Sequence, residues 1–80
     1  MIEPRALDWL LEELCVKFGI CLPPGKLTTF RMEPPTDAEA FTAAVFRAEG
    51  LDPVTADKRL YRSVRDHIEA ALQRSYRRDA

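Results

Sequence analysis

The chain lacks most of the residues and patterns on which catalysis or cofactor binding depends. Its 80 residues include one histidine, two cysteines and three glycines. Cys15 and Cys21 lie six positions apart, which matches neither a CxxC redox pair nor the usual spacing of zinc ligands. The sequence contains no glycine-rich phosphate loop and no acidic calcium loop. We therefore expect no catalytic residues, no cofactor and no metal, and we interpret the protein as non-enzymatic.

Long apolar runs are also missing. None approaches the ~18 residues that suggest a membrane-spanning helix. The first residues, Met-Ile-Glu-Pro-Arg, lack the basic start and the apolar stretch of a signal peptide. We predict a cytoplasmic protein that does not enter a membrane, with both cysteines reduced and buried.

Neither sign of charge dominates the composition. Twelve basic and thirteen acidic residues give a net charge of −1, which offers no general attraction to nucleic acid or to anionic membranes. Residues 51–80 hold seven basic and five acidic residues, so this part is mildly basic. Eighty residues suffice for one domain, and we expect 1–80 to be a single helical domain with a thin core. A thin core makes a homodimer a reasonable alternative to a monomer.

The sequence does contain helical periodicity, most clearly in residues 4–18. From Leu7 to Phe18 the apolar residues follow the i, i+3, i+4, i+7 spacing of one helix face. Pro4 suits a first helical turn, and Gly19 can adopt the left-handed conformation that ends a helix.

Two further helices are expected, over 37–49 and about 54–75. Thr36-Asp37-Ala38-Glu39 has the Thr-x-x-Glu form of a capping box, and Gly50 suits the end of the helix that follows. This second helix is apolar around much of its circumference, which predicts a central position between two neighbours. Asp52-Pro53 or Thr55 opens the third helix, and its short link to the second favours antiparallel pairing. The predicted fold class is all-α, a small three-helix domain packed as an orthogonal or up-down bundle.

The connection at 20–35 is unusually long and rich in residues that interrupt secondary structure. It contains Pro23, Pro24, Gly25, Pro34 and Pro35, which together exclude a long helix. Within it, residues 27–32 fit either an extended piece or a helical turn. Its apolar residues favour packing against the rest of the chain.

Trp9 and Val16 are the most unusual apolar residues of the chain. They lie seven positions apart on the face of the first helix that is opposite its leucines, where solvent is expected. One interpretation is that the 20–35 connection folds back and covers them. The other is that they form a partner-binding surface, together with apolar residues of the connection such as Phe30, because tryptophan often dominates binding energy. The partner would be another protein or a second copy of the chain.

A different class of function is suggested by the basic residues of the third helix. Lys58, Arg59, Arg62 and Arg65 resemble a face that follows nucleic-acid phosphates, because arginine pairs well with phosphate oxygens. Acidic residues interrupt this surface, which favours an ordinary solvated helix face. A protein-interaction or regulatory module is therefore the leading hypothesis, and a nucleic-acid-binding protein is the alternative.

Overall fold

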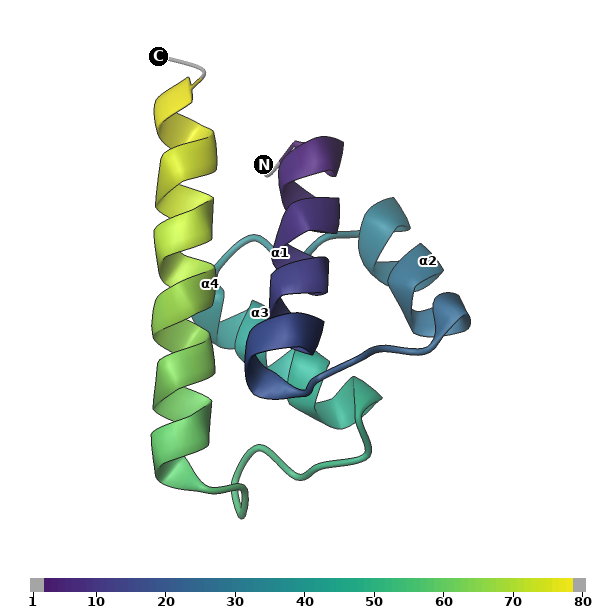
Figure 1. Ribbon diagram of the computed structural model, residues 1–80, viewed down its shortest axis with the longest axis vertical. Coiled ribbons are helices and arrows are strands. Elements are labelled where there is room, and N and C mark those ends of the chain that lie inside the picture. Colours follow the sequence, from purple (N-terminus) through teal and green to yellow (C-terminus); the bar gives the residue numbers. More distant parts are fainter. Residues whose placement is uncertain (1–2, 79–80) are drawn as a thin grey trace.

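The computed structural model describes the backbone of residues 3–78 and the side chains of residues 3–74, and it is all-α (Figure 1). Its helices are α1 (Pro4–Phe18), α2 (Pro24–Met32), α3 (Ala38–Ala48) and α4 (Lys58–Arg78). The all-α prediction is confirmed, and α1 has the predicted bounds. The count of three helices is wrong, because the 20–35 connection contains α2.

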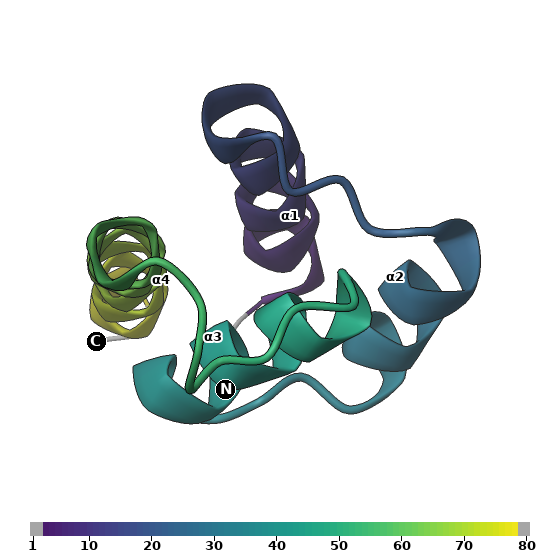
Figure 2. The same ribbon diagram turned by 90° about the horizontal axis from the view of Figure 1, so that it is seen from below.

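The four helices of the described part surround a common core. In Figure 1, α1 and α4 lie side by side and run in opposite directions, with α2 on the other side of α1. Figure 2 views α4 nearly end-on and shows α3 crossing beneath α1, strongly inclined to α4. The orthogonal arrangement is therefore the correct one of the two that we considered. The predicted second and third helices do pack against each other, as α3 and α4, but their predicted antiparallel direction is wrong, because α3 lies across α4.

Local signals at both ends fix α1. Pro4 stands in the first turn, and Gly19 adopts φ 71° at the C-terminal end. The Gly19 N–H donates to the Cys15 carbonyl (3.0 Å), and the Ile20 N–H donates to the Leu14 carbonyl (3.1 Å). Ile20 is then buried against the helix that it follows, as is usual for this type of helix end.

The missed helix α2 starts at a proline. Pro24 suits the first turn because its fixed φ matches the helix and its absent N–H is not needed there. Thr28 and Thr29 donate their hydroxyls to the carbonyls of Pro24 and Gly25, each at 3.1 Å. The helix ends at Met32, just before Glu33 and the pair Pro34-Pro35.

The starts of α3 and α4 both depend on an aspartate. Asp37, and not Thr36, is the N-cap of α3, and its carboxylate accepts from the Ala40 N–H at 2.8 Å. The predicted third helix begins later than expected, at Lys58, where the Asp57 carboxylate accepts from the Arg59 N–H at 2.8 Å. Residues 53–56 form turns instead of helix.

The core is made from one face of each helix. α3 is central as predicted: the Phe41 ring meets Phe30 of α2 at 5.4 Å, and the Phe46 ring meets Tyr61 of α4 at 5.1 Å. The buried apolar residues are Leu7, Leu10, Leu11, Leu14, Ile20, Phe30, Phe41, Val45, Phe46, Val64, Ile68, Ala71 and Leu72.

Candidate interaction surface

Trp9 and Val16 lie on the solvent-facing side of α1 and are exposed. Their exposed fractions are 65% and 78%. The interpretation that the 20–35 connection covers them is therefore wrong. α2 instead lies alongside α1, where the Arg31 Nε donates to the Asp8 carboxylate at 2.7 Å. The contact lies on the flank of α1, so α2 is positioned away from the outer face of that helix.

Two charged residues share the outer face of α1 with this apolar pair. Arg5 and Glu12 are exposed and lie at helical spacing from Trp9 and Val16. We call Arg5, Trp9, Glu12 and Val16 the α1 ridge. It combines a large aromatic side chain, an aliphatic side chain and one charge of each sign.

Phe30 does not belong to this surface. It is only 6% exposed and packs against Phe41 in the core. Its predicted role in partner binding is therefore corrected, because a buried ring cannot form a docking contact while the fold is intact. Of the residues of α2, Met32 is the exposed large apolar one.

A polar cluster borders the α1 ridge on the side of α4. The Glu13 carboxylate lies 3.1 Å from the Lys17 Nζ and 3.4 Å from the His67 Nε2. Desolvation by burial acts to raise the pKa of Glu13, but hydrogen bonds from Lys17 and Trp9 and the nearby His67 outweigh it and lower that pKa below 4.5. The His67 ring also packs edge-on against Phe18, with centroids 5.6 Å apart. The cluster thus joins α1 to α4.

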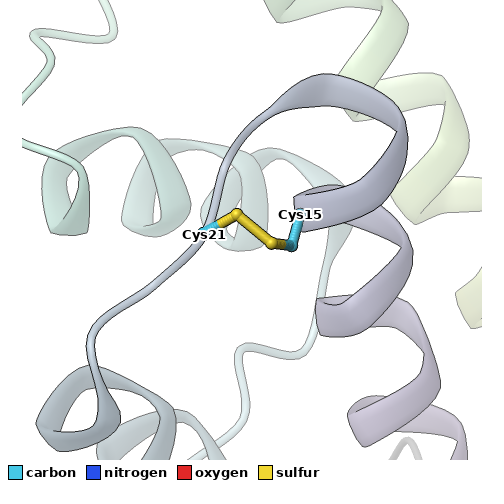
Figure 3. Close-up of a disulfide and its surroundings, with 2 residues drawn as sticks. All are labelled: Cys15 and Cys21. Carbon is cyan, nitrogen blue, oxygen red and sulfur yellow. A yellow bond between two sulfur atoms is a disulfide. The ribbon is translucent and has the colours of Figure 1, made fainter.

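The two cysteines are joined in a disulfide, so the prediction of reduced, buried thiols is wrong. Figure 3 shows Cys15 in the last turn of α1 bonded to Cys21 in the segment that leads to α2. The reversal at Gly19 brings their Cα atoms to 4.3 Å. Cys21 is exposed and Cys15 is partly buried. A spacing of six residues excluded the familiar motifs, but a helix end that turns back on itself makes this spacing suitable for a bridge.

The four basic residues of the nucleic-acid hypothesis are divided by the structure into two kinds. Arg65 is paired, with its Nη1 3.0 Å from the Glu39 Oε1 and its Nη2 3.5 Å from the Asp66 carboxylate. Lys58, Arg59 and Arg62 are exposed and form no ion pair with another described residue. Lys58, Arg62 and Arg65 lie along one face of α4 and Arg59 lies on another, with the acidic residues Asp57 just before them and Asp66 and Glu69 just after them in the chain.

Glu39 connects α3 with α4, a role that the capping-box prediction did not assign to it. Its carboxylate accepts a hydrogen bond from the Tyr61 hydroxyl at 3.1 Å and one from Arg65. Burial and the Glu39 carboxylate raise the pKa of Tyr61 above 10.0. The contact depends on residues 22 and 26 positions apart in sequence, so no local pattern could reveal it.

Neither the remaining geometry nor similarity to other proteins gives a further assignment. Among the side chains of residues 3–74, no group of three or more metal-ligating residues gathers, and within residues 3–78 no helix has the length and apolar composition to cross a bilayer. Comparison of the chain with protein-family models, with curated proteins and with solved structures finds no significant match.

Proposed function

We propose that this chain is a non-enzymatic protein-interaction module that binds its partner through the α1 ridge. The support for this proposal is the exposure of Trp9 and Val16 on one side of a well-defined helix. Tryptophan is strongly enriched among the residues that dominate binding energy, because its large ring loses much water-accessible area and little conformational freedom on binding.

The partner that we test first is a second copy of the chain. If two α1 helices pack antiparallel about a two-fold axis near Trp9, residue 5 of one copy lies opposite residue 12 of the other. Arg5 then faces Glu12 twice, once on each side of the axis, and the two Trp9 rings meet at its centre. A two-fold interface must be self-complementary in this way.

The expected dimer is weak. A helix of 15 residues is about 22 Å long, so one helix pair buries less than the roughly 1,200 Å² of a standard stable interface. Self-association is therefore expected in the micromolar range or above, where sedimentation velocity at increasing protein concentration detects it.

Charge-swap variants make this test specific. Arg5→Glu and Glu12→Arg should each weaken association, because each places like charges opposite one another, and the double variant should restore it. Trp9→Ala should abolish association. Met32→Ala is the matched control, since Met32 is 77% exposed but lies on α2. Two results together would contradict the proposal. The protein would stay monomeric at every concentration, and in affinity capture the Trp9→Ala and Met32→Ala variants would lose the same partners.

We further propose that the protein works in its oxidised form. The cytoplasmic prediction came with the expectation of reduced thiols, and the Cys15–Cys21 disulfide weighs against it, because cytosolic thiols are normally kept reduced. Alkylation of thiols at the moment of cell lysis, followed by mass measurement, tests this. Two alkylated cysteines would restore the cytoplasmic prediction, and none would favour an oxidising compartment.

A further inference from the structure

A concave surface lies between α3, the 53–56 turns and the first turns of α4. It has a volume of about 370 Å³, which is within the range of small-molecule sites. We call it the α4 pocket. Its lining residues are Glu39, Pro53, Val54, Ala56, Lys58, Tyr61, Arg62 and Arg65.

One side of the α4 pocket is cationic. Lys58, Arg62 and Arg65 occupy positions i, i+4 and i+7 of one helix, so all three lie along the same face of α4. Glu39 is the acidic residue of the lining, and the Arg65 and Tyr61 hydrogen bonds already occupy both of its oxygens. The lining therefore carries a net charge of +2, and Lys58 and Arg62 are left without a counter-ion among the described residues.

This arrangement of charge is unfavourable for the isolated fold. Like charges at i, i+4 repel on a helix surface. Lys58 also lies in the first turn of α4, at the positive end of the helix dipole, and this turn contains no acidic residue. The backbone N–H groups at the start of α4 are not the groups that would bind an anion, because the Asp57 carboxylate already accepts hydrogen bonds from two of them. An anion held between the Lys58 and Arg62 side chains would relieve both repulsions.

The other side of the α4 pocket is apolar. Val54 is 84% exposed at its edge, beside Pro53 and Ala56. An aliphatic side chain that lies open to water next to two unpaired cations suits a ligand that has an anionic end and an apolar end.

From these observations we infer that the α4 pocket binds a phosphate monoester that carries a short apolar chain. The phosphate lies between Lys58 and Arg62, and the chain packs on Val54. A monoester has a charge of about −1.5 to −2 at neutral pH, which balances the net charge of the lining, whereas a carboxylate balances only half of it. The α4 pocket contains no residue of α1 and so none of the α1 ridge, and the inference does not depend on the proposed function.

Hexyl phosphate is the probe for the full chain, with binding followed residue by residue in ¹⁵N–¹H correlation spectra. Saturable shifts are expected at Val54, Ala56, Lys58 and Arg62. Inorganic phosphate and hexanoate serve as the partial ligands. Hexyl phosphate should bind about tenfold more tightly than inorganic phosphate, which corresponds to burial of about two methylene groups.

Substitutions separate the two halves of the site. Lys58→Gln and Arg62→Gln should each weaken hexyl phosphate binding about tenfold through loss of a charge-assisted hydrogen bond. Arg59→Gln is the matched control, because Arg59 is exposed in the same turn but does not line the pocket, and it should change the affinity by less than about twofold. Val54→Ser should reduce the affinity for hexyl phosphate to that for inorganic phosphate. The spectra of the variants themselves verify folding.

Three results would overturn the inference: no saturable shift, an equal loss of affinity with Arg59→Gln, or equal affinities for inorganic and hexyl phosphate. Tighter binding of a single-stranded oligonucleotide with a steep salt dependence would also overturn it, in favour of nucleic acid. Phosphatidylcholine vesicles with and without phosphatidic acid distinguish two possible sources of the phosphate monoester, a lipid headgroup and a soluble ester. Binding to the acidic vesicles identifies a lipid headgroup, and binding of hexyl phosphate without vesicle binding identifies a soluble ester.

Discussion

Removal of the Cys15–Cys21 disulfide should lower stability by an amount that follows from its position in the chain. The bridge closes a loop of six residues. In the loop-entropy description, closing a loop of this length lowers the entropy of the unfolded chain and raises its free energy by about 2 kcal/mol at 25 °C. A domain of this size commonly has only ~3–5 kcal/mol of stability, so about half of it would be lost.

The assay is denaturant and thermal unfolding followed by circular dichroism. The Cys15→Ser/Cys21→Ser double variant should unfold about 10 °C below the wild type, and the wild type under reducing conditions should match it. The helical signal at low temperature should persist in both, because the Gly19 and Ile20 hydrogen bonds that end α1 do not depend on sulfur. An unchanged midpoint in the double variant would refute the entropic argument, and two free thiols in the native wild type would refute the bridge itself.

Two further perturbations test other parts of the structure. Trp9→Ala should change the free energy of unfolding by no more than about 0.5 kcal/mol, because the Trp9 ring is exposed. Phe46→Ala should lower it by about 3–5 kcal/mol and leave the chain largely unfolded, because Phe46 is buried. Denaturant titration measures both changes. The pKa of Glu13 is lowered in the folded state, so its contribution to stability is present above pH 4.5 and is lost as the pH falls through the folded value. Glu13→Gln should therefore flatten the decrease of the melting temperature below pH 4.5, and an equally steep decrease would contradict the ion-pair account.

The prediction of α1 succeeded because everything that defines this helix is local. Its apolar residues recur at one spacing, and Pro4 and Gly19 mark the two ends. The start of α4 was misplaced because Asp52 and Thr55 are also good helix starters, and the residues between them and Asp57 form turns. Asp57 caps the helix that actually forms. A choice among several possible caps depends on where the core can accept the helix, which a local pattern does not contain.

The helix α2 was missed for a different reason. It is nine residues long, too short for an apolar stripe, and it offers the core only Phe30 and the partly buried Leu27. Pro24 was interpreted as a residue that breaks helices, although at a first turn it favours one. An isolated helix of this length is marginal in water, so α2 depends on the Phe30–Phe41 contact across the core.

The same contact explains why Trp9 remains exposed. The apolar residues of 20–35 were expected to cover it, but Ile20, Leu22, Leu27 and Phe30 all pack against the core. Because these side chains pack against the core, Met32 is the large apolar residue of the segment that stays exposed. A helical wheel can identify Trp9 as an apolar residue on a polar face, because that property is local. Whether the face is covered depends on the alternative burial sites of a distant segment, and in this chain the core offers better ones.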